Sequence, residues 1–319
     1  MNRLVDIVIP IYNGEQYVSG LIDCLNKQTV KDFCAVIVDD GSKDRTWELL
    51  NEQLKDASFS YELIHQENKG LPGARNTGIR NTKAEWVAFM DSDDGLDPHF
   101  VEYLYRGATE KETNLGYCQY QTVAEESQIV PVHSFSVSEQ TAVDCMKGYY
   151  TRWFGCWVLI LRRKWLSESG LLFDEDCTYL EDVPFITQAI ALADRIAVIE
   201  APLYYYYIRQ GSLMNTPKIE KYAVALKGFH EMAQKLEQCE NEAAGAFRSM
   251  GHARYYLATL RKGATLMPYK KFRELCDIVP MSRVRHQIGN LHKSQALACW
   301  AYLYWKWLFY KLMRILNKM

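Results

Sequence analysis

Short apolar runs alternate with segments of helical periodicity over residues 4–115. Apolar runs of this length predict buried strands, and the periodic segments predict helices. The predicted strands cover residues 4–9, 34–38, 61–65 and 86–90, and the predicted helices cover 17–25, 47–54, 72–81 and a segment that Asp97 caps, with Pro98 as its first residue. This alternation predicts an α/β fold with a doubly wound, mostly parallel sheet.

The apolar run at 86–90 ends in three carboxylates, those of Asp91, Asp93 and Asp94. Carboxylates this close repel one another, so they are expected to face water or to share a cation. Mg²⁺ and Mn²⁺ prefer oxygen ligands and bind through one or two carboxylates plus substrate phosphates. Ligands of open α/β sheets lie beyond the carboxyl ends of the strands. Asp91 and Asp93 are therefore a candidate metal–diphosphate site, and a solvated acidic turn is the alternative.

A second strand-end loop carries carboxylates suited to a nucleotide. Asp39 and Asp40 follow a predicted strand and precede Gly41, which permits a tight turn. A carboxylate there can accept a hydrogen bond from a base N–H or a ribose hydroxyl. The alternative is that one aspartate caps the next helix, although Ser42 or Asp44 could serve as the cap instead.

A third loop, at residues 68–76, combines glycines with the cations Lys69 and Arg75. Glycines allow close backbone approach, and the cations can pair with a diphosphate or a base carbonyl. A salt bridge between Arg75 and a neighbouring aspartate is the alternative.

Composition and charge narrow the classes of protein. The 319 residues, 48% of them hydrophobic and 24% charged, suffice for one large domain or two modest ones. The net charge of −2 gives no indication of a nucleic-acid partner. Nine cysteines without C-x-x-C spacing predict neither a zinc site nor a disulfide framework, so we expect reduced thiols in a cytoplasmic protein. The N-terminus enters a predicted strand almost at once, so no signal peptide is expected.

Four motifs occur in an order and spacing that resemble glycosyltransferase family 2, whose members have the GT-A fold. They are IPIYN at 9–13, VDDGSKD at 38–44, ARNTG at 74–78 and FMDSDD at 89–94. The resemblance is specific over residues 4–115, is looser to about 215 and fades beyond that. It implies a nucleotide-sugar donor, usually a UDP-sugar, a divalent metal cofactor (Mn²⁺ or Mg²⁺) and inversion at the anomeric carbon.

The same resemblance implies roles for individual residues. Asp91 and Asp93 correspond to the family's D-x-D pair, with Asp93 as the direct metal ligand. The residues expected around the nucleotide sugar are Pro10, Tyr12, Glu15, Asp40, Lys69, Arg75, Ser92 and Arg209, and Ser212 is a further candidate at the diphosphate. For Arg209 the alternative is an exposed position after a tyrosine-rich strand.

Inversion requires a base that takes the proton of the acceptor hydroxyl. The candidate pair is Glu181 and Asp182, which opens an apolar helical stretch. Family members carry such a pair with Asp as the usual base, so the resemblance favours Asp182. Adjacent helical residues do not share a face, and acids at a helix start also act as caps. Trp153 and Trp157 are candidates to line the acceptor site, with core packing as the alternative for at least one of them.

These assignments divide the chain into a catalytic GT-A domain at 1–215 and a helical C-terminal region at 216–319. The catalytic domain has its nucleotide-sugar side at 1–115 and its acceptor side at 116–215. The tail at 297–319 carries three tryptophans, three tyrosines and four cations. On a helical wheel Lys311, Arg314 and Lys318 fall together, which suits a helix in a membrane interface. Packing of the tail into the domain or a dimer partner is the alternative.

The sequence thus predicts a metal-dependent, inverting hexosyltransferase on the cytoplasmic face of the cell membrane, bound peripherally. The expected acceptor is a saccharide or lipid-linked saccharide of surface polysaccharide synthesis. The Gln-x-x-Arg-Trp motif of processive members is unmatched, since Tyr149 stands where its Gln would precede Arg152 and Trp153. A non-processive enzyme is therefore expected, with no nucleic-acid partner and with homo-oligomerisation left open. A sugar nucleotidyltransferase and a non-catalytic sugar-binding protein of the same fold are the alternatives.

Overall fold

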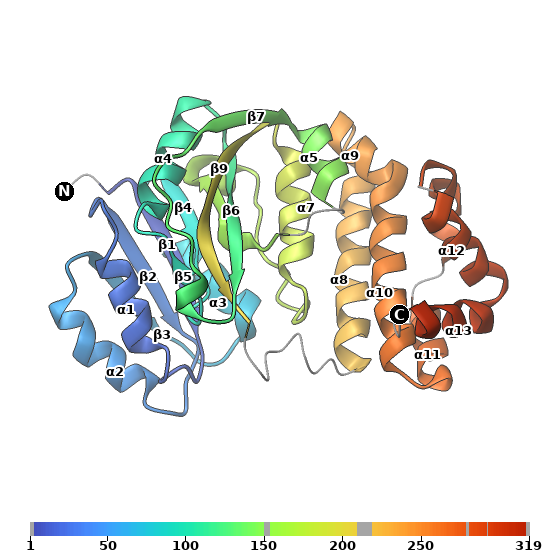
Figure 1. Cartoon of the computed structure of the whole chain (residues 1–319), viewed down its shortest axis with the longest axis horizontal. Helices are drawn as coiled ribbons and strands as arrows, with labels where there is room; N and C mark the ends of the chain where they lie inside the picture. Colours follow the sequence, from blue (N-terminus) through green and yellow to red (C-terminus); the bar gives the residue numbers. More distant parts are fainter. Residues whose placement is uncertain (1–2, 150–153, 209–218, 279–280, 292, 317–319) are drawn as a thin grey trace. The chain divides into compact units, whose positions relative to one another are not determined.

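The computed structural model describes residues 3–149, 154–208, 219–278, 281–291 and 293–316, and the chain forms two compact units that we treat separately (Figure 1). The first unit comprises Met1–Thr141, Phe154–Glu175 and Leu192–Gln210. The second comprises Ala142–Trp153, Asp176–Ala191 and Gly211–Met319. Each unit thus draws on segments that are far apart in the sequence.

The first unit is built on a nine-stranded mixed sheet, counted over the described residues. The strands are β1 Val5–Ile11, β2 Phe33–Asp39, β3 Ser60–His65, β4 Trp86–Phe89, β5 Gly95–Leu96, β6 Leu115–Val123, β7 Val137–Thr141, β8 Leu159–Arg162 and β9 Arg195–Tyr207. Their order is β3-β2-β1-β4-β8-β6-β9-β5, with β7 also paired to β9. Strands β1 to β4 run parallel, as does β6 with β9, which confirms the predicted α/β class.

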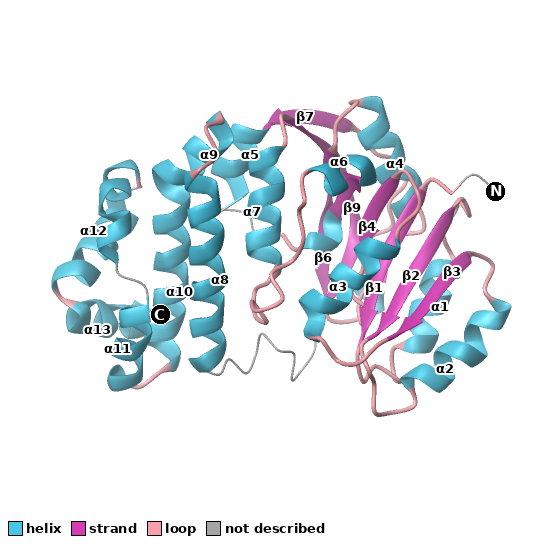
Figure 2. Ribbon diagram, turned by 180° about the vertical axis from the view of Figure 1, so that it is seen from behind, coloured by secondary structure: helices cyan, strands magenta, loops and turns pink. Residues whose placement is uncertain are grey.

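Helices cover both faces of the parallel half of the sheet. Helices α1 and α2 lie on one face and α3 lies on the other (Figures 1 and 2). The helices of this unit are α1 Val18–Asn26, α2 Thr46–Gln53, α3 Gly70–Asn81, α4 Phe100–Glu110 and α6 Arg163–Glu168, with short 3-10 turns at Leu54–Asp56, Glu126–Gln128 and Cys156–Val158. Strands β1, β2 and β4 are buried along their whole length because they are covered on both sides.

The strand order changes direction between β1 and β4, which lie side by side although two strands separate them in the chain. Such a reversal marks the ligand crevice of open α/β sheets. Helix α3 packs closely on β1 at this point, because a Cβ at Gly78 of α3 would lie 2.3 Å from Val8 Cγ1 of β1. Glycine therefore lets α3 lie directly on the central strand.

Two predicted helix starts differ from the structure. Helix α3 begins at Gly70, so Pro72 lies in its first turn, where a proline leaves no hydrogen bond unmade. Helix α4 begins at Phe100, and Asp97 instead caps the turn before it, since its Oδ1 accepts the His99 N–H at 2.9 Å. The antiparallel strand β8, between β4 and β6, had no counterpart in the sequence prediction.

The second unit contains helices and connecting loops, and no strand in its described part. Its helices are α5 Ala142–Tyr149, α7 Asp182–Leu192, α8 Ile219–Glu237, α9 Glu242–Ala246, a π-helical turn Phe247–Gly251, α10 His252–Leu266, α11 Tyr269–Ile278, a 3-10 stretch Met281–Asn290, α12 Lys293–Tyr304 and α13 Lys306–Leu316. The rings of Phe229 in α8 and Tyr255 in α10 stack at 3.5 Å. The tail forms two helices that break at Trp305. Among the described helices, none combines the length and the apolar character that a membrane span requires.

Candidate functional site

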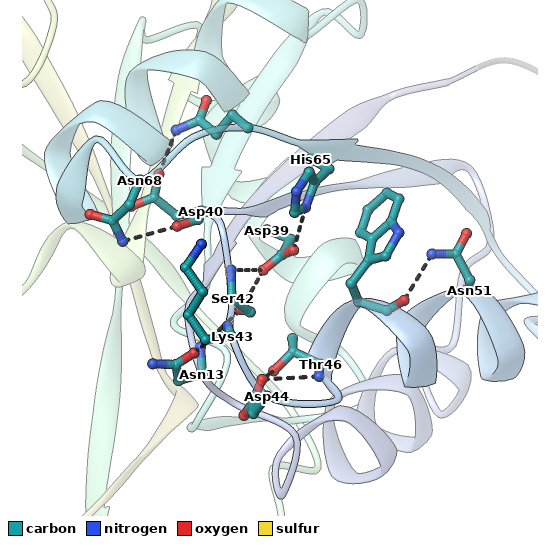
Figure 3. Close-up of polar contacts among 12 residues, drawn as sticks. Asn13, Asp39, Asp40, Ser42, Lys43, Asp44, Thr46, Asn51, His65 and Asn68 are labelled. Atoms are coloured by element: carbon teal, nitrogen blue, oxygen red, sulfur yellow. Dashed lines mark hydrogen bonds and ion pairs between the residues drawn. The ribbon is translucent and has the colours of Figure 1, made fainter.

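The carboxyl ends of β1 to β4 bring the predicted polar loops to one edge of the sheet. Asp39 at the end of β2 pairs with Ile11 of β1 on one side and with His65 of β3 on the other. The N–H of Asp40 donates to the Ile11 carbonyl at 2.9 Å, so strand pairing continues into the loop. The N–H of Gln66 donates in turn to the Asp39 carbonyl at 3.0 Å. The loops after β1, β2 and β3 therefore share one hydrogen-bonded frame (Figure 3).

Asp39 acts inside this frame rather than at its surface. Its fully buried carboxylate accepts bonds from the N–H and hydroxyl of Ser42 and lies 2.6 Å from His65 Nδ1. Gly41 adopts a φ of +74°, and a Cβ there would lie 3.0 Å from the Asn68 nitrogen. The turn after β2 is thus fixed by an internal carboxylate and requires glycine.

Asp40 is also buried, but its carboxylate is engaged on one side. Oδ1 accepts the Gln66 side-chain amide at 2.6 Å and the Lys69 N–H at 2.9 Å. The Asp40 carbonyl accepts the Asn68 side-chain amide at 2.9 Å (Figure 3). Both carboxylate bonds go to Oδ1, so Oδ2 is the oxygen that a ligand would meet.

The loops after β1 and β2 brace one another. Asn13, with a φ of +48°, donates its N–H to Ser42 Oγ at 2.9 Å and accepts the Lys43 N–H at 2.7 Å. Glu15 Oε2 accepts the Arg45 N–H at 2.9 Å. Glu15, predicted beside the nucleotide, therefore has a structural contact in this brace.

Asp44 performs the capping role that was the alternative for Asp40. Its Oδ1 accepts the N–H of Thr46, the first residue of α2, at 3.0 Å, and its Oδ2 accepts the Glu15 N–H at 3.1 Å. The cap leaves Asp40 outside the helix start, as a ligand role for Asp40 requires.

Arg75 pairs with the first carboxylate of the acidic turn. Its Nη2 lies 2.7 Å from Asp91 Oδ1, and its guanidinium lies over the Phe173 ring at 5.2 Å. Arg75 is only 2% exposed, whereas Asp91 is half-buried. The salt bridge that was the alternative role for Arg75 is therefore present, and it orients the Asp91 carboxylate and offsets its charge.

The third carboxylate of the turn points inward. Asp94 is buried, its Oδ2 accepts the Tyr204 hydroxyl at 2.8 Å, and its Oδ1 accepts the Tyr207 N–H at 3.0 Å. Burial, together with the charges of Asp91 and Asp93, raises the pKa of Asp94 to about 8. The acidic turn therefore separates into one internal carboxylate and two half-buried ones, Asp91 and Asp93.

The half-buried pair suits a cation that also binds a substrate. Among the described residues, no group of three or more His, Cys, Asp or Glu side chains could hold a metal ion alone. Mg²⁺ and Mn²⁺ commonly need fewer protein ligands, because diphosphate oxygens and water complete their shell. Asp91 and Asp93 fit that donor set, and Asp91 already gives Oδ1 to Arg75.

One buried residue in the third motif carried no prediction. Asn76 donates to the Phe173 carbonyl and to Glu175 Oε1, both at 2.9 Å, and accepts the Phe173 N–H at 2.8 Å. It fixes the segment at 173–175 against α3. The sequence indication was a polar residue next to Arg75 within the third motif, ARNTG at 74–78.

The other predicted donor residues take different positions. Pro10 lies inside β1 and is buried, Tyr12 is 49% exposed just after β1, Lys69 is exposed before α3, and Ser92 is half-buried. Arg209, Ser212 and Trp153 lie outside the described residues. Trp157 is buried, and its ring stacks on those of Tyr204 at 4.3 Å and Tyr206 at 5.8 Å. Core packing is thus its role in this unit.

Glu181 and Asp182, the two candidates for the base, belong to the second unit. Leu180 has a φ of +55°, and the Val183 N–H donates to its carbonyl at 3.1 Å, which forms the turn into α7. Glu181 is buried, whereas Asp182, the first residue of α7, is half-buried. The turn thus distinguishes two adjacent acids by burial.

Comparison with known proteins identifies the family. The family model described as "Glycosyl transferase family 2" matches residues 6–170. The chain belongs to glycosyltransferase family 2. Its D-x-D turn and the three loops before it all lie inside the matched range.

Relatives agree with this membership. The chain is 31% identical over 225 residues to "Uncharacterized glycosyltransferase EpsJ" of Bacillus subtilis, which covers 68% of this chain and 64% of EpsJ. It is 30% identical over 145 residues to "Teichoic acid poly(glycerol phosphate) polymerase" of Staphylococcus epidermidis, covering 45% of this chain and 18% of the polymerase. The chain therefore spans less than two thirds of these relatives.

The crystal structure of S. aureus TarS 1–349 in complex with UDP-GlcNAc shares the fold. The TM-score is 0.77 at 20% identity, and the alignment covers 99% of this chain and 91% of that one. The chain, a member of family 2, therefore has the GT-A type of fold that the sequence predicted.

Proposed function

We propose that the chain transfers a hexose from a UDP-sugar to a hydroxyl of a saccharide acceptor, with inversion at the anomeric carbon. The observation that carries the proposal is the frame of strand-end loops in which Asp40, Asp91 and Asp93 are held at the carboxyl edge of β1 to β4. This edge adjoins the reversal of strand order, where open α/β sheets bind ligands.

The nucleotide is proposed to bind across the loops after β1, β2 and β3. Asp40 Oδ2 would accept a hydrogen bond from the base or ribose, and the exposed ring of Tyr12 would lie beside them. The proposed donor-binding set also includes Pro10, Glu15, Lys69, Arg75, Ser92 and Arg209. A UDP donor is supported by the similar fold of TarS, which was solved with UDP-GlcNAc.

Mn²⁺ or Mg²⁺ is proposed at the acidic turn. Asp93 would be the direct ligand, and Asp91, oriented by Arg75, would complete the protein side of the site. When bound, the cation would offset the charge that builds on the departing UDP. Arg75 holds the Asp91 carboxylate in place without the cation.

Asp182 is the proposed base. Its carboxylate would take the proton of the acceptor hydroxyl while that oxygen bonds to the anomeric carbon and the bond to UDP breaks. Attack opposite the leaving group inverts the configuration and leaves a protonated Asp182 and free UDP. The half-buried position of Asp182 suits contact with an acceptor better than the buried position of Glu181.

The acceptor is proposed to be a saccharide or lipid-linked saccharide of surface polysaccharide synthesis, extended by one sugar per encounter. The similarity to a teichoic acid polymerase supports this class. We assign catalysis to residues 1–215 and place the protein on the cytoplasmic face of the cell membrane, held there peripherally by the tail.

A panel of nucleotide sugars tests the proposal. With Mn²⁺ present, the true donor should raise the melting temperature further as its concentration rises above its dissociation constant, and turnover should release UDP. Formation of pyrophosphate and a nucleotide sugar from UTP and a hexose 1-phosphate, without UDP release from any donor, would assign the chain to the nucleotidyltransferases. Stabilisation without any turnover, across a panel of saccharide acceptors, would favour a sugar-binding protein.

A further inference from the structure

The C-terminal segment carries a charge opposite to that of the rest of the chain. Residues 278–319 contain seven cations and no acid, a formal charge of +7. The 277 residues before them hold 30 cations and 39 acids, a formal charge of −9. A net charge near zero therefore conceals a strongly basic segment.

The two terminal helices divide their apolar side chains between two faces. One set packs inside the second unit: Cys299, Tyr302, Phe309, Tyr310 and Met313 are buried. For example, the Tyr310 hydroxyl donates to the Met267 carbonyl at 2.8 Å. The other set is exposed, and we call it the outward face: Leu297, Trp300, Tyr304, Trp305, Trp307, Leu308, Leu312 and Ile315. Trp305 and Trp307 are 64% and 55% exposed, unusual values for so large an apolar side chain.

Cations border the outward face. The Arg285 guanidinium lies 5.7 Å from the Trp300 ring and donates to the Tyr304 hydroxyl at 2.9 Å. Lys311 Nζ lies 5.4 Å from the Trp307 ring. Lys293 is exposed at the start of α12. Aromatic rings and cations thus lie together here, and residues 278–319 contain no acid. The exposed Asp277 carboxylate, just before this segment, pairs with Lys306 Nζ at 3.0 Å.

We propose that the outward face docks on a bilayer that contains anionic lipid. Tryptophan and tyrosine favour the headgroup region, and the exposed leucines and isoleucine suit the acyl boundary beneath it. The cations supply attraction to anionic headgroups, which decays with salt. The aliphatic part of the face favours a bilayer over a nucleic acid, whose phosphates would meet only the cations. This surface deepens the proposed membrane location but does not depend on catalysis.

Flotation with vesicles tests the surface. The intact protein should float with phosphatidylcholine vesicles that contain phosphatidylglycerol, less so at high salt and weakly with phosphatidylcholine alone. Trp305→Ser with Trp307→Ser, and separately Lys293→Glu with Lys311→Glu, should each lower binding by about tenfold or more. The exposed control pair Lys55→Glu with Lys164→Glu makes the same charge change elsewhere and should bind as the wild type does.

Three results would overturn the surface. One is an equal loss of binding in the control pair, since net charge would then explain it. Another is an absence of flotation together with a mass that rises with protein concentration and falls in the tryptophan variant, which would assign the face to a second copy of the chain. The third is binding to an RNA oligonucleotide without flotation. Because no arm measures transfer, a failed glycosyltransferase assay leaves the conclusion from flotation intact.

An independent observation concerns Tyr204 of β9, which sequence motifs did not single out. Its hydroxyl accepts the Asp91 N–H at 3.1 Å and donates to Asp94 Oδ2 at 2.8 Å. The side chain is fully buried, and its ring stacks on Trp157 at 4.3 Å. One hydroxyl therefore ties both ends of the turn at 91–94 to a neighbouring strand.

We infer that Tyr204 is a positioning residue for this turn, on which the proposed cation site rests. Asp93 lies between the two tied residues, so the hydroxyl limits how far its carboxylate can move. Tyr204→Phe removes one oxygen atom and keeps the ring packing, so the fold should persist. Tyr206→Phe is the matched control, because its ring stacks on the same tryptophan at 5.8 Å.

Calorimetry of UDP in the presence of Mn²⁺ measures the effect without turnover. Tyr204→Phe should weaken Mn²⁺-dependent UDP binding by about 10-fold, the usual lower range for residues that orient metal ligands. UDP binding in EDTA should change little, whereas the melting temperature should fall by a few degrees, because the buried Asp94 Oδ2 and the Asp91 N–H lose their partner. Tyr206→Phe should match the wild type. Wild-type binding in Tyr204→Phe, while Asp93→Ala loses the Mn²⁺ effect, would reduce Tyr204 to core packing. If Mn²⁺ does not affect wild-type UDP binding, the cation site fails and this role fails with it.

Discussion

The strand-end loops and the outward face of the tail are both proposed to bind partners, yet they are built in opposite ways. In the loops, Asp39, Asp40 and Asp94 are buried, and each accepts at least two hydrogen bonds. On the outward face, the tryptophans are exposed. Lys311 at its border is exposed too, and its Nζ lies 5.4 Å from the Trp307 ring. The first arrangement fixes atoms, and the second presents a surface.

The difference predicts how each region responds to substitution. A frame of buried carboxylates, each held by hydrogen bonds from neighbouring residues, concentrates its function in single atoms, so one change should remove most of the activity. An exposed surface distributes its binding over many weak contacts, so single changes should be small and nearly additive.

The largest effect is expected for Asp93→Ala. Removing the proposed metal ligand should lower transfer by about 10³-fold, because a Lewis acid contributes several kcal/mol at the departing diphosphate and each 1.36 kcal/mol is tenfold in rate. UDP release in the presence of Mn²⁺ measures it. EDTA should reproduce the loss in the wild type, and full activity in EDTA would show that the strand-end frame works without a cation.

Asp182→Asn comes next. Loss of the base should reduce kcat by roughly 10²- to 10⁴-fold, while UDP affinity stays unchanged because the base touches the acceptor. Calorimetry with UDP and single-turnover transfer separate these quantities. Glu181→Gln is the matched control and should be milder. An inactive Glu181→Gln beside an active Asp182→Asn would reverse the assignment.

The parallel and antiparallel strands of the sheet differ in how far the sequence could predict them. Strands β1, β2 and β4 were predicted because they are apolar runs buried on both faces, and local composition alone marks such strands. Strand β8 was not predicted. Its apolar run is short, it becomes a strand through antiparallel pairing with β4 and β6, and no local pattern specifies those partners.

Within the site, residue types were predictable but their orientations were not. Asp91 and Asp94 are the same residue type three positions apart, so the sequence does not distinguish them. Their carboxylates differ because Arg75 donates to that of Asp91 and the Tyr204 hydroxyl donates to that of Asp94. Likewise, the break at Trp305 divides a tail whose apolar and basic pattern is compatible with one continuous helix. Tertiary partners decide such features, and they are remote in sequence.

A smaller effect is expected for Asp40→Ala. It should weaken UDP binding by about 1–3 kcal/mol, the scale of a lost hydrogen bond to a charged group. Calorimetry measures the affinity, and thermal unfolding is needed beside it, because the Gln66 amide and Lys69 N–H also lose their acceptor. Asp40→Asn keeps the shape of the side chain, and its UDP affinity should lie between those of the wild type and Asp40→Ala. Unchanged UDP affinity in a folded Asp40→Ala protein would remove this residue from the site.

The smallest single effect should come from the outward face. Trp307→Ala should lower affinity for phosphatidylglycerol-containing vesicles by about three- to tenfold, since one interfacial aromatic is only partly buried on docking. Its melting temperature should stay near that of the wild type, because the side chain is exposed. Phe309→Ala is the contrasting variant, since Phe309 is fully buried against Phe272 and Tyr302 and its loss should destabilise the second unit. Deleting residues 297–319 would confuse the two faces by removing both at once. If Trp307→Ala abolished vesicle binding outright, the tail would hold a concentrated site like that of the strand ends, and the contrast between the two regions would fail.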